Sequence, residues 1–333
     1  MSNRHTPVVR LAPAKLNLTL AVIGRRRDGF HDLHSVMVPL ALADRLSFAL
    51  AAGRDDSLHV AGGPGGTTPL DPAGFGSVLQ GIREARKVVG RGADTFPLAV
   101  RLEKRIPVAA GLAGGSSDGA AAIEGALEAW GAEVDCAARL RAAAATGSDV
   151  PFFLAGGPAL VEGRGEKVTP LAGIEGPPPG VLLVTPAVEA STQRAFHVFD
   201  TDPAAAPGFR GSTRLSSEHL AQELGPTYAA MDAPSLASRA GVFAVSNDLA
   251  KAADLIVPGL RDLRRSMTRL LGVPVGLSGS GPTLWALYPS LDGAEAAATQ
   301  IRESLALGTL DAPGAKPPFV AATTIVSPPR RPA

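Results

Sequence analysis

The sequence predicts an α+β protein whose helices pack in layers on its sheets. Three observations support this fold class. Residues 8–23 alternate between polar and apolar side chains as an extended chain does, helical periodicity follows a glycine-rich segment near residue 115, and several short apolar stretches lie beyond residue 180. Strands that precede a pair of helices and then interleave with further helices argue against a regularly alternating parallel sheet.

The composition describes a globular chain without a dominant charge. Its 333 residues are 45 % apolar, which suffices for a sizeable core and for two domains. Lys and Arg total 32 against 31 Asp and Glu, so no overall field attracts nucleic acid or a membrane surface. Cys136 is the only cysteine, which excludes an intramolecular disulfide, and no Cys/His cluster indicates a zinc site.

The chain shows no sign of a targeting segment. Its N-terminal residues lack the apolar core of a signal peptide, and no run of about 18 apolar residues suggests a membrane span. We therefore expect a cytoplasmic protein with neither a nucleic-acid nor a membrane partner. The sequence leaves the oligomeric state open.

Periodicity predicts the elements of the first half of the chain. Ile123, Leu127 and Trp130 fall at i, i+4 and i+7, which predicts an amphipathic helix with one buried stripe and Gly131 as its C-cap. A second helix is expected over 135–145. The other predicted features are extended chain at 8–23, a turn at 27–29, an apolar stretch at 36–42, a flexible loop at 62–76, a helix at 78–89 and a strand at 98–102.

A Gly/Pro-rich segment at 175–180 predicts a domain boundary, which divides the chain into domains 1–179 and 180–333. The features predicted beyond it are strands at 181–184, 274–277, 283–287 and 319–326, helices around 249–271 and 293–307, and an inserted loop at 200–218.

The glycine-rich segment 107–121 is the most informative stretch. Gly111, Gly114 and Gly115 allow the backbone to approach a ligand closely, and the residues Ser116, Ser117 and Asp118 that follow are typical helix N-caps. A strand expected before the segment and a helix after it indicate an anion site at a helix N-terminus, where the serine hydroxyls can add contacts to phosphate or Mg²⁺. Neither GxxxxGK[ST] nor GxGxxG occurs in the chain, so a nucleotide here needs another type of loop.

This segment resembles the phosphate-binding motif of the GHMP kinases, Pro-x-x-x-Gly-Leu-Gly-Gly-Gly-Ser-Ser-Asp-Ala-Ala. Ala113 and Gly119 replace a usual Gly and a usual Ala. The resemblance implies a two-domain GHMP kinase fold, with an N-terminal ribosomal-S5-like α/β domain that binds ATP and a C-terminal ferredoxin-like α/β domain. It also implies ATP and Mg²⁺ as cofactors, with Ser116 or Ser117 as a possible metal contact. The residues that it assigns to ATP are Pro107, Gly111, Leu112, Ala113, Gly114, Gly115, Ser116 and Ser117.

Three further motifs match the family in order along the chain. In Ala12-Pro-Ala-Lys-Leu-Asn-Leu-Thr-Leu20, a strand places Lys15 and Asn17 on one face, which fits a site better than a core. The segment 146–153 contains Asp149, which the resemblance assigns as the base that accepts the proton of the substrate hydroxyl, with Lys15 beside it. The segment 276–287 resembles the C-terminal Met-Ser-Gly-Ser-Gly motif, and its loop Ser278, Gly279, Ser280 and Gly281 is expected to close the site.

One branch of the family, which phosphorylates the 2-hydroxyl of a cytidine-diphosphate alcohol in non-mevalonate isoprenoid synthesis, is the best match. Its Gly-x-Arg-x-Asp-Gly-Tyr-His-x-Leu segment is similar to 24–33, where Phe30 and His31 offer a stacking face and a hydrogen-bonding edge to cytosine. Phe196 lies in a second branch motif and is expected on the other side of the base. The residues that the resemblance assigns to the substrate are Asn17, Phe30, His31, Asp149 and Phe196.

The sequence departs from this branch at one place. The branch usually carries an Asn before its second helix, whereas this chain has Ser77 there, so either Ser77 replaces the Asn or the nucleotide contact has moved. Two alternatives stay open: another GHMP kinase of the homoserine or mevalonate type, and a catalytically inactive regulatory or binding protein with this fold. The presence of Lys15, Asp149, Ser116 and Ser117 argues against an inactive relative.

Overall fold

The structure, a computed structural model, describes residues 6–62, 68–90, 97–205, 211–225 and 231–327. The chain divides into two compact units, neither of which is continuous in sequence. The first unit comprises Met1–Ala14, Leu42–Val108 and Ala113–Leu154, and the second comprises Lys15–Ala41, Ala109–Leu112 and Ala155–Ala333. The family-domain boundary at residues 179 and 180 stays a prediction.

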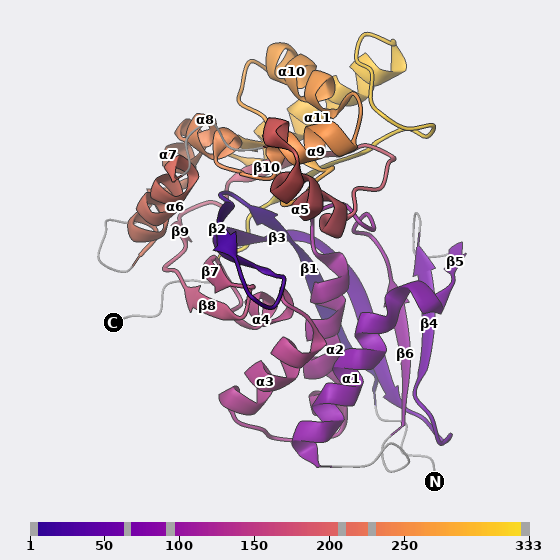
Figure 1. The fold of residues 1–333 in the computed structure, drawn as a ribbon. Coiled ribbons are helices and arrows are strands. Elements are labelled where there is room, and N and C mark those ends of the chain that lie inside the picture. Colours follow the sequence, from indigo (N-terminus) through magenta and orange to yellow (C-terminus); the bar gives the residue numbers. More distant parts are fainter. Residues whose placement is uncertain (1–5, 63–67, 91–96, 206–210, 226–230, 328–333) are drawn as a thin grey trace. The chain divides into compact units, whose positions relative to one another are not determined.

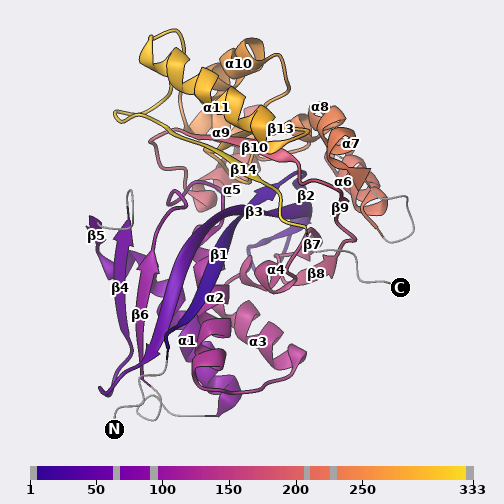
Figure 2. The same cartoon turned by 180° about the vertical axis from the view of Figure 1, so that it is seen from behind.

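The first unit is a sheet with helices on one face, as Figures 1 and 2 show from opposite sides. Its elements are the start of β1 (Val8–Asn17), the end of β3 (His31–Leu50), β4 (Ser57–Gly62), β5 (Thr68–Leu70), the 3-10 helix η2 (Pro72–Phe75), α1 (Gly76–Val89), β6 (Leu98–Glu103), α2 (Gly114–Ala129), α3 (Cys136–Thr146) and α4 (Val150–Leu154). The strand order is β5-β4-β6-β3, with β6 antiparallel to β3 and parallel to β4.

The core of this unit forms where the sheet meets α1 and α2. The inward side chains of the sheet include Phe48 and Leu102, which are almost completely buried. The predicted stripe of Ile123, Leu127 and Trp130 is buried in the same cluster, which confirms the amphipathic helix. Burial of this stripe fixes which face of α2 points to solvent.

Two glycines allow α2 to lie unusually close to its neighbours. A Cβ on Gly81 of α1 would lie 2.5 Å from the carbonyl oxygen of Gly119 in α2, and a Cβ on Gly125 would lie 2.2 Å from the ring of Phe48. Side chains at these positions would push the helices and the sheet apart. The absence of side chains therefore sets the position of α2, whose N-terminus follows the glycine-rich segment.

The second unit contains a four-stranded antiparallel sheet of order β12-β13-β10-β14, a smaller strand group around the start of β3, and eight helices among the described residues. Its elements are the end of β1, β2 (Ala21–Arg25), the start of β3, β7 (Ala159–Gly163), β8 (Lys167–Pro170), β9 (Ile174–Glu175), β10 (Gly180–Thr185), α5 (Thr192–Thr201), η3 (Pro203–Ala205), α6 (Ser212–Glu223), β11 (Met231–Asp232), α7 (Ala233–Ser238), α8 (Ala240–Val245), α9 (Ala250–Ile256), α10 (Leu260–Leu271), β12 (Gly276–Leu277), β13 (Leu284–Tyr288), α11 (Leu291–Ala306) and β14 (Phe319–Thr324).

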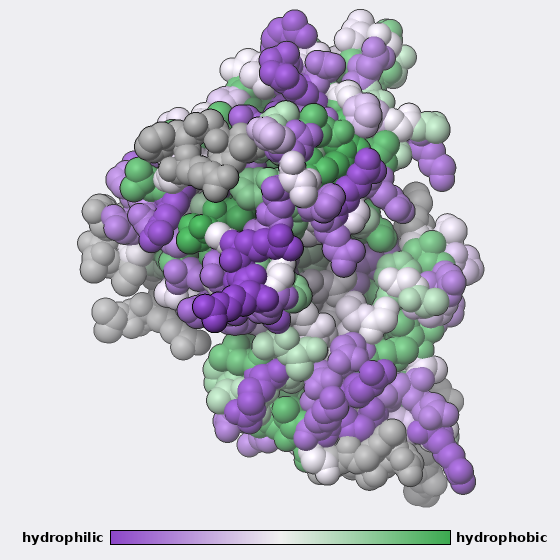
Figure 3. Space-filling model, in the orientation of Figure 1, coloured by the Kyte–Doolittle hydropathy of each residue, from purple (hydrophilic) through white to green (hydrophobic). Residues whose placement is uncertain are grey.

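Packing in the second unit follows from its apolar strands. Strand β10 is buried along its whole length, and α11 packs on β10, β13 and β14. Around the start of β3, β2 and β7 pair with it antiparallel. Hydrophilic residues gather on the surface over the hairpin of β2 and β3, as Figure 3 shows. No helix of the described chain is both long and apolar enough to cross a membrane.

Most predicted elements are confirmed, and two predicted loops are wrong in part. The region 62–76 contains β5 and η2, which the side chain of Asp71 caps, while 63–67 lie outside the described residues. The region 200–218 contains the start of α6, and 206–210 lie outside the described part. Two of the buried residues of α6 are the polar Thr213 and Ser217, so the apolar period that marks a helix is missing.

The predicted helical region 249–271 is two helices. Helix α9 ends before Pro258, which lacks the N–H that a helix requires, and Gly259 has the left-handed φ of 84° at the N-cap of α10. Helix α2 also begins earlier than predicted, at Gly114, which places Ser116, Ser117 and Asp118 inside the helix rather than ahead of it.

The close crossing of α1 and α2 can be tested with a matched pair of glycine substitutions in α1. Gly81→Ala should lower the free energy of unfolding by about 1–3 kcal/mol through overpacking, although alanine is the better helix former by about 1 kcal/mol. Gly76→Ala in the same helix meets no atom within 4 Å and should be neutral or stabilising. Urea denaturation measures both. Equal effects of the two substitutions would contradict the close crossing.

Candidate active site

Lys15 and Asn17 lie on one face of β1, as the strand period predicted, and both side chains are buried. The Lys15 Nζ donates hydrogen bonds to Asn17 Oδ1 at 2.5 Å and to the Gly111 carbonyl oxygen at 2.8 Å. Asn17 in turn donates from Nδ2 to Ser35 Oγ at 2.8 Å, and Ser35 donates to the Thr19 carbonyl at 2.5 Å. The ammonium group is thus held in a fixed position by neighbours that are themselves fixed.

The loop Ser278–Gly281 meets Lys15 at Gly111, within the second unit. Ser278 Oγ donates to the Gly111 carbonyl at 3.0 Å, the same oxygen that accepts from Lys15. Gly111 has a φ of 76°, and a Cβ there would lie 2.3 Å from the Ser278 carbonyl oxygen. Gly279 has a φ of 58°, and its Cβ would lie 3.3 Å from Lys15 Nζ. The structure therefore brings together Lys15, Asn17, Gly111 and this loop, in contacts that leave no room for a side chain at Gly111 and little room for one at Gly279.

Asn247 holds the same loop from behind. Its Nδ2 donates to the carbonyls of Leu277 at 2.9 Å and Gly279 at 2.8 Å, and its Oδ1 accepts from the Leu249 amide. Ser280 shares a hydrogen bond of 3.0 Å with Thr192 at the start of α5. Asn247 therefore positions the loop.

The start of α2, in the first unit, has the properties of an anion site. Ala113 is the N-cap with a φ of 53°, and the Ser117 amide donates to the Ala113 carbonyl at 3.0 Å. The preceding three amides, of Gly114, Gly115 and Ser116, have no carbonyl one turn earlier in the helix to bind. They point out of the positive end of a 16-residue helix. Left-handed Ala109 and Ala113 each cost about 1–2 kcal/mol, strain that is typical of ligand sites.

Ser117 fits a role toward a metal–phosphate ligand. Its Oγ is buried and has no hydrogen-bond partner in the described structure, which is unusual for a hydroxyl. The described residues contain no group of three or more His, Cys, Asp or Glu side chains that could hold a metal ion. Mg²⁺ in nucleotide sites commonly takes one or two protein oxygens and completes its shell with phosphates and water. The hydroxyl of Ser117, and that of Ser116 beside it, suit such a shared shell.

An ion network that sequence reasoning missed lies beneath the start of α2. Lys104, just after β6, donates from Nζ to Asp118 Oδ2 at 2.7 Å and also to Asp44 Oδ2. Asp44 Oδ1 accepts from the amides of Arg105 and Ile106. Burial raises the pKa of Asp118 to about 7, against the opposing effect of Lys104 and with the help of Asp44. The only sequence pattern that could have indicated this network is a lysine at the end of a strand, Lys104, followed by an aspartate in the next helix, Asp118.

Asp149 is half-buried and directly precedes α4, within the first unit. Lys15 belongs to the second unit, so the expected pairing of Asp149 with Lys15 stays a prediction. Ser77 lies in the first turn of α1, and its Oγ is 3.7 Å from where a Cβ on Gly115 would stand. Both alternatives, that Ser77 replaces the family's Asn and that the nucleotide contact has moved, stay open.

The residues expected to bind cytosine gather in the second unit. The His31 ring stacks on Phe196 with centroids 4.6 Å apart and an angle of 16° between planes. A base between these rings would require them to separate to roughly 7 Å, twice a normal contact distance. Phe30 is 50 % exposed, and the guanidinium of Arg164 lies 4.5 Å from its ring centroid.

Two polar partners of these rings were not predicted. His31 Nε2 and Asp200 Oδ1 are 2.8 Å apart, so the carboxylate orients the imidazole and leaves Nδ1 for another partner. Arg164 comes from the turn between β7 and β8, far from Phe30 in sequence. No motif linked either residue to the aromatic cluster.

Comparisons with known proteins identify the family of this chain. The chain matches the family described as GHMP kinases N terminal domain over residues 77–157 and that described as GHMP kinases C terminal over 227–307. The 4-diphosphocytidyl-2-C-methyl-D-erythritol kinase of Pelotomaculum thermopropionicum is 33 % identical over 297 residues, which cover 89 % of this chain and 94 % of that protein.

Solved structures point the same way. A crystal structure of 4-(cytidine 5'-diphospho)-2C-methyl-D-erythritol kinase superimposes with a TM-score of 0.64 at 29 % identity, over 95 % of this chain and 99 % of the other. The homoserine kinase of Cytophaga hutchinsonii shares the fold, with a TM-score of 0.65 at 17 % identity over 98 % and 96 % of the two chains. The chain therefore belongs to the GHMP kinases and, among them, to the family of the 4-diphosphocytidyl-2-C-methyl-D-erythritol kinases. This membership implies ATP as the phosphoryl donor.

The raised pKa of Asp118 gives stability a specific pH dependence. Because the folded pKa of about 7 exceeds the ordinary 3.8, the folded state binds more protons between these values. The contribution of Asp118 to the free energy of unfolding should therefore fall as the pH rises from about 4 to about 7. Urea denaturation across this pH range measures the free energy of unfolding of the wild type and of Asp118→Asn. The contribution of Asp118 is the wild-type value minus the value for the variant. A difference that is constant or that grows with pH would contradict the assignment.

Proposed function

We propose that this protein transfers the γ-phosphoryl group of ATP to the 2-hydroxyl of 4-diphosphocytidyl-2-C-methyl-D-erythritol, a step of non-mevalonate isoprenoid precursor synthesis in the cytoplasm. The observation that carries the choice of substrate is the contact between His31 and Phe196, distant in sequence and both in motifs of this branch. An aromatic pair with a hydrogen-bonding edge suits a nucleobase. The names of the two related kinases described above both specify a substrate that contains cytidine.

The phosphate groups of ATP are assigned to the glycine-rich segment. Its residues Pro107, Gly111, Leu112 and Ala113 lead into α2, whose first amides supply donors and the positive end of the helix dipole. Mg²⁺, when bound with ATP, would neutralise phosphate charge, and Ser116 or Ser117 would hold it. The adjacent network of Lys104 with Asp44 and Asp118 anchors this end of the helix.

Chemistry at the acceptor is assigned to two residues. Asp149 accepts the proton of the 2-hydroxyl as the oxygen attacks phosphorus, and Lys15 stabilises the negative charge that develops. The contacts of Lys15 with Asn17 and Gly111 support this role because they hold a buried ammonium in one place. The loop Ser278–Gly281 helps to hold Gly111, and through it Lys15, in position. Asn17 is also assigned to the substrate.

Cytosine recognition is assigned to Phe30, His31 and Phe196. With Nε2 of His31 directed at Asp200, Nδ1 is the ring nitrogen available to a base. Opening of the His31–Phe196 stack would admit the base between aromatic faces, while Phe30 adds an exposed face beside Arg164.

The proposal predicts the outcome of a substrate panel. ADP release, measured with Mg²⁺-ATP and the cytidyl alcohol, homoserine or mevalonate, should occur with the cytidyl alcohol alone. Asp149→Asn should lower kcat on that substrate by at least about 100-fold while its KM stays within a few-fold, because general base catalysis contributes about 10²–10⁴. Turnover of homoserine or mevalonate would overturn the substrate assignment. If folded protein that binds ATP releases no ADP with any of the three substrates, a regulatory protein is favoured. If Asp149→Asn keeps its activity, Asp149 is not the general base.

A further inference from the structure

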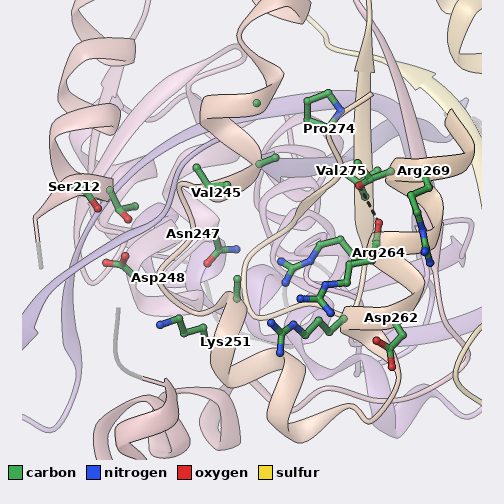
Figure 4. A pocket seen from close by; sticks show the side chains of 17 residues that line it. Ser212, Val245, Asn247, Asp248, Lys251, Asp262, Arg264, Arg269, Pro274 and Val275 are labelled. Carbon is green, nitrogen blue, oxygen red and sulfur yellow. Dashed lines mark hydrogen bonds between the residues drawn. The ribbon is translucent and has the colours of Figure 1, made fainter. Parts of the chain in front are cut away.

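A cavity of about 950 Å³ lies in the second unit among α6, α8, α9 and α10. Figure 4 shows Asp248 and Lys251 on one side of it and Asp262, Arg264 and Arg269 of α10 on the other. None of its lining residues is assigned to ATP or to the cytidyl substrate. The lining residues are Ser212, Thr213, Gly241, Ala244, Val245, Asn247, Asp248, Ala250, Lys251, Arg261, Asp262, Arg264, Arg265, Thr268, Arg269, Pro274 and Val275.

The lining is strongly basic. Five of the residues are Lys or Arg, against two carboxylates, in a chain whose overall charge is only +1. Arg261, Arg265 and Arg269 stand at i, i+4 and i+8 of α10 and so share one face of the helix. Like charges at this spacing destabilise a helix by about 0.2–0.5 kcal/mol per pair. Part of this repulsion is offset within the fold, because burial raises the pKa of Asp254 and Arg264, Arg261 and Arg265 oppose that rise. A bound anion would offset the repulsion further.

Several polar side chains of the cavity are already engaged. The Asn247 side chain uses Nδ2 for the carbonyls of Leu277 and Gly279 and Oδ1 for a backbone amide. Thr268 Oγ1 donates to the Arg264 carbonyl, and Asp248 Oδ2 accepts from the Val22 amide. Asn247 and Thr268 therefore contribute little to ligand recognition, and the basic side chains are the main groups that can supply it.

The guanidinium groups differ in what they already bind. Arg264 pairs with Asp254 at 2.7 Å, and Arg269 donates to the neutral Ser266 Oγ at 3.2 Å. Arg261 and Arg265 have no hydrogen-bond or ion-pair partner within the described ranges. Each presents a planar set of donors that matches a phosphate group in two-point contact.

We propose that this cavity binds a small molecule that carries two linked phosphate groups. Arginines one helical turn apart have Cβ atoms about 5–6 Å from one another, a separation suited to adjacent phosphates. The cavity volume lies within the roughly 300–1,000 Å³ of small-molecule sites. Arg261 and Arg265 bind the two phosphates, with Lys251 and Arg269 adding positive charge around them. The ligand class is an organic diphosphate, and inorganic pyrophosphate is the minimal probe.

Calorimetric titration of pyrophosphate into the full chain, without Mg²⁺, tests this site. Because the start of α2 can also take pyrophosphate, the number of sites is compared between proteins. Arg261→Gln/Arg265→Gln should lose one site, or bind there at least about tenfold more weakly, since two charge-assisted contacts are removed. Orthophosphate should bind the same site more weakly in the wild type.

The matched control is Arg54→Gln/Arg141→Gln, which removes the same charge from exposed positions of the first unit. It should titrate as the wild type does. The proposal is overturned if Arg261→Gln/Arg265→Gln titrates unchanged, if the control loses as much affinity, or if the wild type has no site that this pair of arginines affects. Kinase turnover is not used as the readout, so failure of this site and failure of the proposed reaction are separate results.

Discussion

The carbonyl oxygen of Gly111 is the point on which the candidate active site depends. It accepts hydrogen bonds from Lys15 Nζ and Ser278 Oγ, and so joins a strand, the glycine-rich segment and a loop from near the end of the chain. These contacts require Gly111 to lack a side chain, because a Cβ there would overlap the Ser278 carbonyl, while Gly279 supplies the left-handed backbone that brings its loop against Lys15. Burial of an ammonium is costly unless it is hydrogen-bonded, so the same contacts stabilise the fold and orient the group that we propose stabilises charge in the reaction.

A second constraint acts at the start of α2. The helix is held close to α1 at Gly81 and Gly119 and anchored from below by Lys104, Asp44 and Asp118. Its first amides and the buried hydroxyl of Ser117 are left without intrahelical partners, and left-handed Ala113 adds strain. Packing and ion pairing thus fix the position of a helix N-terminus whose free amides and hydroxyl can bind an anion.

Much of the fold and of the candidate site was predictable from the sequence, and there is a physical reason why the remaining features were not. The stripe of Ile123, Leu127 and Trp130 and the shared face of Lys15 and Asn17 depend only on the helix and strand periods, so local pattern sufficed. Asp200 and Arg164 reach the aromatic cluster through tertiary packing, which no local spacing encodes. Helix α6 was missed because polar Thr213 and Ser217 occupy its buried face, where Ser217 binds Thr19 and His34.

The most direct test of this account is the turnover of Lys15→Met on the cytidyl alcohol. Methionine keeps much of the volume of the lysine stem and removes the ammonium, and Lys167→Met removes an exposed lysine as the control. Circular dichroism and ATP binding establish that the variant is folded. The account predicts that kcat falls by about 10²–10³, as when a preorganised charge-stabilising group is lost, and that the control retains full activity. A folded Lys15→Met variant with kcat within a few-fold of the wild type would contradict it.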